Sequence, residues 1–412
     1  MTRLLSPLIV LALAATALAA PAAPVLPASS PTLAFQHVAV LSQQIGPRPA
    51  GSANDARGAD YIADQFRRLG YAVERQQFPF RYFEETQAPS LTVLTPAQGP
   101  IRLITLEFSA STAPDGLEAE LVAAGLGRPQ DLSGTRLDGR IALVERGQIQ
   151  FREKAANVAA AGGAAVIVYN TQGGPVAATL VEPSRIPAVI IGQDDGQRLA
   201  ELLKTGTVRV RLGVRTIVEQ RMTENVIGIK RGTTAPNEIV VVGGHRDSVR
   251  VSPGANDNGT GTAAVLETAR LLAGVPTART IHFIGFGAEE VGLLGSAFYV
   301  KNATAPIAGM VNMDMVGRGP GIMAGNQTGQ PLMLDIAETV ARRLDTPLRR
   351  FRLGQSDHVP FEQAGIPAVF LHTGDDDAIH TPNDTLDRVS GQLIATAASL
   401  AAGIALEVAN RR

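Results

Sequence analysis

The fold of this 412-residue chain is decided by residues 238–272, which read EIVVVGGHRDSVRVSPGANDNGTGTAAVLETARLL. The run Ile239–Gly243 is short and nearly all apolar, as expected of a strand that is covered on both faces of a sheet. Apolar residues then recur at helical spacing over Gly261–Leu272. A strand followed by a helix, with a polar, glycine-rich loop between them, predicts one repeat of an α/β domain.

The same alternation of strand and helix continues from Glu224 to the end of the chain. Further strands are predicted at Asn225–Ile229, Thr280–Gly287, Met310–Met315 and Ala368–Leu371, and further helices at Leu332–Leu344 and Gln392–Leu406. We therefore expect a three-layer αβα domain with a mixed, mainly parallel sheet. In an open sheet of this kind, functional residues lie beyond the carboxyl ends of the strands.

The residue pattern differs between Pro114 and Val214. This region contains no His, and glycine-rich turns separate its short apolar runs, which are Ile141–Val144, Val166–Tyr169 and Ala188–Ile191. One helix is predicted within it, at Phe151–Ala161. We assign residues 114–214 to a β-rich inserted domain without chemistry of its own. Residues 32–113 and 215–412 then form the main domain, in which helices at Leu33–Ile45 and Asp55–Leu69 precede a strand at Tyr71–Phe80.

The N-terminus predicts export. Arg3 precedes an apolar run, Leu4–Leu18, and Ala17-Leu18-Ala19 forms a cleavage pattern, so residues 1–19 are expected to be a signal peptide. A proline-rich linker, residues 20–31, follows. The alternative is a membrane anchor, which the short run and the prolines after it disfavour. We expect a secreted or periplasmic protein that is not bound to a membrane once the signal is cleaved.

Charge and cysteine content narrow the classes of function. The formal net charge is −1 and no Lys/Arg tract occurs, so a nucleic-acid-binding surface is not expected. The chain has no Cys, which excludes disulfides and thiolate chemistry. Any metal site must therefore be built from His and carboxylates.

Such residues end or follow four of the strands predicted in the main domain, Ile239–Gly243, Thr280–Gly287, Met310–Met315 and Ala368–Leu371: His245 and Asp247, Asp257, Glu289 and Glu290, Asp314, and His380. Two His and three carboxylates suit zinc. A pair of cations roughly 3.5–4 Å apart needs a bridging carboxylate to offset their repulsion. In the adjacent pair Glu289-Glu290, one carboxylate can bind metal while the other accepts a proton. Asp247 can reach the far ring nitrogen of His245 and fix its tautomer.

Other polar residues have simpler explanations. His282 lies within a predicted strand and is expected to be a core residue, while His372 ends another strand and could support the site. Asp375-Asp376-Asp377 predicts a solvated acidic loop, with a secondary possibility that it contacts the amine of a substrate.

Five segments together resemble the motifs of the M28 family of zinc peptidases, which includes secreted leucine aminopeptidases of bacteria. They are residues 243–248, 254–261, 286–296, 312–317 and 380–385. Residues 115–213 separately resemble a protease-associated (PA) domain, through Asp138–Gly147 and Lys154–Ala164. PA domains are inserted in this way in some members of the family.

The resemblance implies a metal centre with two Zn²⁺ ions. His245 and Asp314 would bind one zinc, Glu290 and His380 the other, and Asp257 would bridge them. Glu289 would be the general base that acts on a metal-bridging water, and Asp247 would orient His245. In the family the peptide bond after the bridging Asp is often cis, which here is Asp257-Asn258.

The resemblance also implies a substrate site. The loop that contains His358 resembles the segment beside the substrate pocket. Some members have Tyr immediately before the last His ligand; this chain has Ile379 there, which would line the pocket. The expected activity is a metallo-aminopeptidase, a hydrolase acting on the N-termini of peptides or proteins, and a monomer is expected. The preferred side chain is not predicted.

Two alternatives remain at this point. The same metals serve a carboxypeptidase or a glutaminyl cyclase among relatives, and Arg246, Arg250 or Arg318 could bind a terminal carboxylate. The fold with a PA domain also serves as a non-catalytic receptor-like binding domain, although such relatives usually lack metal ligands.

Overall fold

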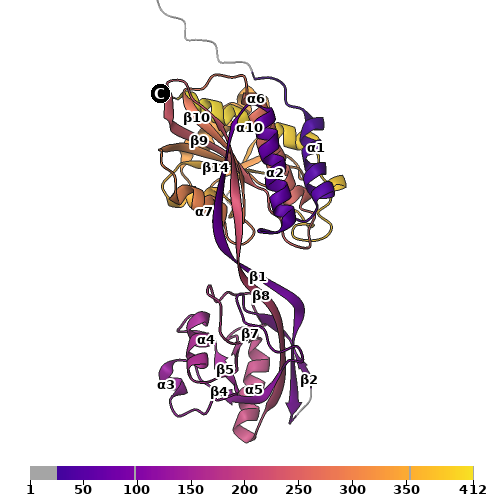
Figure 1. The fold of residues 1–412 in the computed structure, drawn as a ribbon, viewed down its shortest axis with the longest axis vertical. Coiled ribbons are helices and arrows are strands. Elements are labelled where there is room, and N and C mark those ends of the chain that lie inside the picture. Colours follow the sequence, from indigo (N-terminus) through magenta and orange to yellow (C-terminus); the bar gives the residue numbers. More distant parts are fainter. Residues whose placement is uncertain (1–25, 97–98, 352–353, 412) are drawn as a thin grey trace, which may run out of the picture. The chain divides into compact units, whose positions relative to one another are not determined.

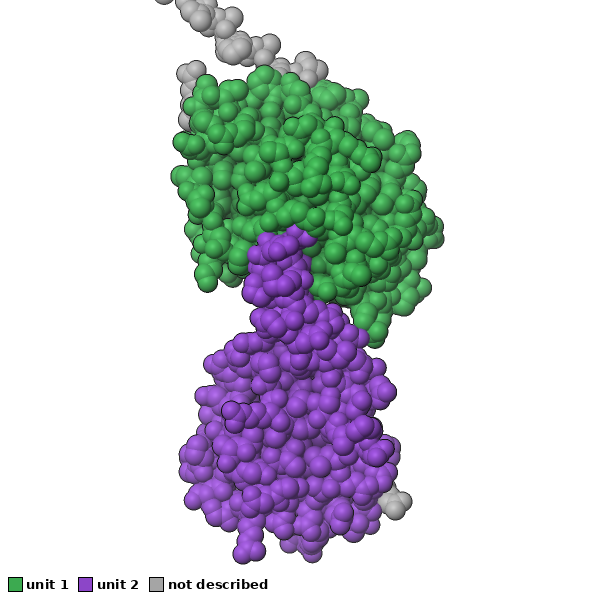
Figure 2. Space-filling model, in the orientation of Figure 1, with its two compact units in different colours: residues 1–76, 225–412 green, residues 77–224 purple. Residues whose placement is uncertain are grey.

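The computed structural model describes residues 26–96, 99–351 and 354–411 (Figure 1). The chain forms two compact units, one of residues 1–76 and 225–412 and the other of residues 77–224 (Figure 2). The second unit thus includes residues 77–113 and 215–224 in addition to the predicted insert, because the long strands β1 (Ala72–Thr95) and β8 (Arg209–Lys230) run into it. The predicted signal peptide lies outside the described residues.

The first unit contains a mixed sheet whose strands lie in the order β13-β12-β14-β11-β9-β10-β8. Besides β8, this sheet comprises β9 (Ala235–His245), β10 (Arg279–Phe286), β11 (Ile307–Met313), β12 (Met323–Gly325), β13 (Arg349–Phe351) and β14 (Ala368–His372). Strands β14, β11, β9 and β10 are parallel, whereas β12 and β8 are antiparallel to their neighbours β14 and β10. The predicted mixed, mainly parallel sheet is therefore confirmed.

Side chains alternate between the two faces of the central strands, and both faces are buried. In β9, Val240 and Val242 belong to a large core cluster on one face, while Ile239 and Val241 belong to a second cluster on the other. The first cluster contains residues of α1 (Pro31–Ala39), α2 (Ala53–Arg68), α6 (Gly261–Leu272), α8 (Pro331–Arg343) and α10 (Gly391–Asn410). The second contains residues of α7 (Leu294–Lys301) and α9 (His358–Gln363). Helices on both faces make the three predicted layers.

Helix α10 is the one helix among the described residues that is long and apolar enough to cross a membrane by length and composition. Its most apolar window is 67% buried within the structure. Ala398, Ala401 and Ala405 belong to the core cluster shared with α6 and α8, so burial within the unit accounts for the apolar composition.

The second unit is built on strands in the order β8-β4-β5-β6-β7-β3. The predicted apolar runs form β5 (Ile141–Glu145), β6 (Ala165–Tyr169) and β7 (Ala188–Ile191), and the predicted helix forms α4 (Phe151–Ala160). The remaining elements are β2 (Gly99–Ile101), β3 (Leu103–Thr105), β4 (Leu117–Ala123), α3 (Pro129–Leu132) and α5 (Gln193–Thr205). The inserted domain is thus β-rich, as predicted.

Replacing Phe283 by Ala tests the core of the first unit. Phe283 is fully buried in β10, and its ring centroid lies 6.3 Å from that of Phe66 and 5.3 Å from that of Tyr71. We expect Phe283→Ala to lower the free energy of unfolding by about 3–5 kcal/mol, since a large cavity would remain. Leu344→Ala, at a position that is 40% exposed, is the control, and urea unfolding measures both. Equal losses in the two variants would contradict this placement of the core.

Candidate metal centre

The polar residues singled out in the sequence meet at the carboxyl ends of four parallel strands. His245 is the last residue of β9, Glu289 and Glu290 follow β10, and Asp314 directly follows β11. His380 lies in the loop after β14. Asp257 lies in η2 (Ala255–Thr260), the turn between β9 and α6, and the Asp257-Asn258 peptide bond is cis. Parallel strands place all these ends at one edge of the sheet.

One group of possible ligands forms around His245. Its Nε2 atom lies 3.3 Å from Oδ1 of Asp257 and 3.4 Å from Oδ1 of Asp314. All three residues are buried, and their nearest N and O atoms lie within 4.8 Å of one another. This spacing leaves room for one cation among the three atoms.

A second group forms around His380. Its Nε2 atom lies 3.0 Å from Oε2 of Glu290 and 3.1 Å from Oδ2 of Asp257. These three atoms also lie within 4.8 Å of one another. Asp257 therefore belongs to both groups, with one carboxylate oxygen facing each.

Buried polar atoms in these groups lack well-aligned hydrogen bonds to the described residues. They are Nε2 of His245, Oε1 of Glu290 and Oδ1 of Asp314. Buried polar atoms nearly always have a partner, so such a cluster indicates that a bound species completes it. Imidazole nitrogens and carboxylate oxygens are ligands that zinc accepts.

The pKa values of the residues in the two groups also favour a bound cation. Burial alone would raise the pKa of Asp257, but contacts with His245 and His380 hold it well below its usual range. Hydrogen bonds to Asp257 and Glu290 raise the pKa of His380 to about 10. Burial raises the pKa of Glu290 to about 7. Without metal, protonated imidazoles thus supply positive charge that a bound cation would replace.

Glu289 is placed beside the first group rather than within it. Its Oε2 atom lies 3.9 Å from Nε2 of His245, and the side chain lines a cavity. Burial raises the pKa of Glu289 well above its usual range, and the nearby carboxylates of Asp314 and Asp357 add to this. A carboxylate with a raised pKa beside a metal position has the properties of a proton acceptor.

Asp247 contacts the centre in a different way from the one we expected. Its carboxylate lies 3.8 Å from Nδ1 of His245, whereas its own backbone carbonyl is nearer, at 3.1 Å. The carboxylate instead accepts hydrogen bonds from the backbone N–H groups of Glu289 and Glu290, at 3.2 and 3.3 Å. Asp247 thus orients His245 through its main chain and the Glu289-Glu290 turn through its side chain.

The cavity above these residues has a volume of about 500 Å³. Glu289, Glu290, Asp314 and His380 form its polar side. Its apolar side is formed by Leu293, Met315, Met323, Phe351, Phe370 and Ile379. Ile379, just before His380, is therefore one of the residues that line the cavity. His372 also lines the cavity, and its Nδ1 atom contacts the backbone carbonyl of Asp314 at 2.7 Å.

His358 does not line the cavity. It is fully buried at the start of α9, and its ring stacks on Phe370 with the centroids 4.8 Å apart. Burial lowers the pKa of His358 to about 4, so the ring is neutral at physiological pH. Because Phe370 lines the cavity, His358 supports a cavity wall from behind, whereas the resemblance implies a place beside the substrate.

The acidic loop 375–377 is not uniformly solvated. Asp376 is buried and accepts hydrogen bonds from Arg318 and from Nδ2 of Asn256 at 2.9 Å, while exposed Asp377 pairs with Arg318 and Arg388. Only Asp375 lines the cavity. His282, by contrast, is half-buried in β10, and its Nδ1 atom is hydrogen-bonded to the Tyr299 hydroxyl at 2.8 Å, so it is a satisfied structural residue.

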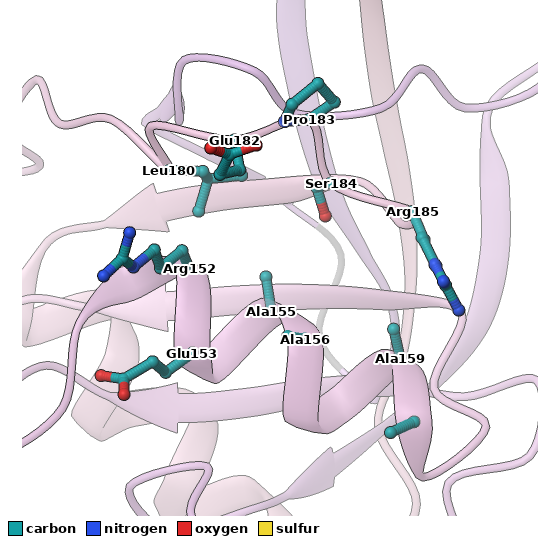
Figure 3. A pocket seen from close by; sticks show the side chains of 11 residues that line it. Arg152, Glu153, Ala155, Ala156, Ala159, Leu180, Glu182, Pro183, Ser184 and Arg185 are labelled. Carbon is teal, nitrogen blue, oxygen red and sulfur yellow. The ribbon is translucent and has the colours of Figure 1, made fainter.

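A second cavity, of about 460 Å³, lies in the second unit (Figure 3). Its walls are Ala155, Ala156 and Ala159 of α4 and the loop from Leu180 to Arg185. The described residues that line it include no His, and neither possible metal group lies there. Both possible metal groups instead contribute residues to the cavity of the first unit.

The chain is similar to known peptidases. Residues 225–405 match the model of peptidase family M28, and residues 114–199 match that of the PA domain. The chain is 35% identical to aminopeptidase YwaD of Bacillus subtilis over 400 residues, which is 92% of this chain and 85% of that protein. It is 32% identical to leucine aminopeptidase 2 of Arthroderma otae, over 79% of this chain and 68% of the relative.

The fold of the chain is also similar to solved structures of aminopeptidases. An aminopeptidase from Aneurinibacillus sp. strain AM-1 superposes with a TM-score of 0.78 at 32% identity, covering 93% of this chain and 94% of that one. BSAP, a zinc aminopeptidase from Bacillus subtilis, superposes with a TM-score of 0.71 at 34% identity, covering 94% and 97%.

Zinc binding to the metal-free protein should release protons. His380, with a pKa of about 10, is protonated at neutral pH, and Glu290, with a pKa of about 7, is partly so. Both must lose their protons to bind metal, so apparent zinc affinity should rise with pH. Between about pH 6 and about pH 8 the number of protons released should fall by up to about one, as Glu290 deprotonates.

Calorimetry in buffers of different ionisation enthalpy measures this release. His282→Gln is the control, since His282 lies outside both metal groups. Zinc binding without proton release would contradict the assignment of His380 and Glu290 as ligands.

Proposed function

The chain belongs to peptidase family M28 and is a zinc aminopeptidase, and we propose that it uses two zinc ions with Glu289 as general base. The observation that carries the proposal is the position of Asp257. Its Oδ1 atom faces His245 at 3.3 Å and its Oδ2 atom faces His380 at 3.1 Å. One carboxylate shared in this way between two ligand groups is what a pair of cations requires.

His245 and Asp314 would hold one zinc, Glu290 and His380 the other, and Asp257 would bind both. When bound, the zinc pair supplies a Lewis acid that polarises the scissile carbonyl and makes water acidic enough to attack at neutral pH. The anionic ligands Asp257, Glu290 and Asp314 offset the repulsion between the two cations.

Glu289 would move the proton. It lies beside the two groups of possible metal ligands, belongs to neither of them, and lines the cavity. We propose that one of its carboxylate oxygens takes a proton from the attacking water and then returns it to the nitrogen of the leaving peptide. Asp247 would position this carboxylate, because it accepts the backbone N–H of Glu289.

The cavity favours an apolar N-terminal residue. Met323, Phe351 and Phe370 form its apolar side, which would bury an aliphatic or aromatic side chain. Relatives named leucine aminopeptidase support the same preference. We therefore propose peptides with Leu, Met or Phe at the N-terminus as substrates.

The carboxypeptidase alternative is not favoured. Among the residues that the structure describes, no Lys or Arg lines the cavity. Arg246 is buried and paired with Asp55 at 2.9 Å, and Arg318 is paired with Asp376. Neither is placed to bind a terminal carboxylate in the cavity. The non-catalytic alternative is not favoured either, because all five possible metal ligands and Glu289 are present.

We further propose that the protein is exported and acts as a monomer outside the cytoplasm. The support for export is the charged start, short apolar run and cleavage pattern of residues 1–19.

Leucine anilide and an N-acetylated leucyl peptide separate the possible activities. We expect turnover of the anilide only, because an acyl group on the amine removes the free N-terminus that an aminopeptidase recognises. Glycine anilide should be cleaved more slowly, since one lost aliphatic side chain is worth about 1.5–3 kcal/mol of burial. Cleavage of the blocked peptide alone would contradict aminopeptidase activity.

Glu289→Gln tests the general base. The amide has the same shape but accepts a proton poorly, so kcat should fall by about 10²–10⁴-fold while zinc content stays unchanged. Glu338→Gln, on the surface of α8, is the matched control and should retain full activity. Zinc content comes from elemental analysis of both proteins. Unchanged kcat in Glu289→Gln would rule out this base.

A further inference from the structure

The loop that carries Asp257 is fastened to the strand end that carries Asp314. Nδ2 of Asn258 donates to the carbonyl of Met313 at 3.0 Å. Oδ1 of the same side chain accepts the N–H of Met315 at 3.2 Å and that of Gly261 at 2.8 Å. Met313 and Met315 flank Asp314, and Asn258 is fully buried. One amide therefore links Asp257 to both neighbours of Asp314.

The same loop is fastened independently to the loop that carries His380. The Asp384 carboxylate accepts the N–H of Asn256 at 2.7 Å and that of Asp257 at 3.0 Å. The Asp384 carbonyl accepts the N–H of Ala255 at 3.3 Å. Asp384 is 1% exposed and lies four residues after His380. Three consecutive amides of the Asp257 loop thus bond to a single residue of the His380 loop.

We propose that Asn258 and Asp384 are positioning residues, each of which orients a different carboxylate oxygen of Asp257. Asn258 sets Oδ1 of Asp257 against Asp314 and His245, and Asp384 sets Oδ2 of Asp257 against His380 and Glu290. The inference rests on the proposed pair of zinc ions. Neither side chain belongs to either ligand group, so each acts through Asp257.

These separate roles make a selective prediction for each residue. Losing the Asn258 amide should loosen Asp257 relative to Asp314 and weaken the zinc held by His245 and Asp314. Losing the Asp384 carboxylate should loosen Asp257 relative to His380 and weaken the other zinc. Residues that orient metal ligands typically change metal affinity by about 10–100-fold when replaced.

Single-site backgrounds separate the two effects. The full chain with His380→Ala keeps the ligands of the first zinc, and the full chain with His245→Ala keeps those of the second. Asn258→Ser and Asp384→Asn are each placed in both backgrounds, and zinc affinity is measured by competition with a chromophoric chelator. Asp387→Asn, three residues after Asp384 and exposed, is the matched control.

We expect Asn258→Ser to weaken zinc binding by about 10-fold or more in the His380→Ala background and by less than about 3-fold in the other. Asp384→Asn should show the reverse pattern. If Asn258→Ser does not fold, Asn258→Asp replaces it, because this variant keeps the shape and loses the donor to Met313. Equal losses in both backgrounds would overturn the proposal and show a general structural role.

Failure of the proposed function has a different signature. If the unmodified protein binds one zinc instead of two, the two-zinc proposal itself is wrong. The separate positioning roles of Asn258 and Asp384 are then wrong as well. If it binds two zinc ions but the losses are equal, only the positioning roles are overturned.

Discussion

The structure depends on one constraint, which is the concentration of carboxylates in a buried site. Asp257, Glu289, Glu290 and Asp314 gather beside His245, and burial raises the pKa of both glutamates. Carboxylates packed this closely repel one another unless cations or protons offset their charge. The two zinc ions that we propose would provide that charge, and they would also supply the Lewis acidity that peptide hydrolysis needs. Electrostatic balance and catalysis are thus two consequences of one arrangement.

The loops around this charge are held by buried polar side chains. Arg48 is fully buried, and its guanidinium donates to five backbone carbonyls, those of Leu41, Gly46, Arg246, Pro253 and Gly254. Burial lowers the pKa of Arg48 to about 10, which still leaves it charged. It fastens the segment just before Asp257, while Asn258 and Asp384 fasten the segment around it. Rigid loops place the ligands before metal arrives.

Local patterns in the sequence predicted the elements that are buried on both faces. Helix α6 and strand β7 have the predicted bounds, because continuous apolar runs and helical spacing are visible within a few residues. The length of β1 was not predicted, since Pro79 and Pro89 argue against a long strand, and β8 extends well before the predicted strand Asn225–Ile229. The burial of His358 and of Asp376 also escaped prediction. So did the hydrogen bond that the Asn256 N–H donates to the Asp384 carboxylate, which joins residues 128 apart in sequence and leaves no local pattern.

The central claim is that Asp257 bridges two zinc ions, and anomalous diffraction at the zinc absorption edge tests it most directly. In crystals of the zinc-loaded protein the account predicts two peaks about 3.5–4 Å apart. One peak should contact His245 and Asp314, the other Glu290 and His380, and both should contact Asp257. A single peak in fully loaded crystals, or two peaks that do not share Asp257, would contradict the account.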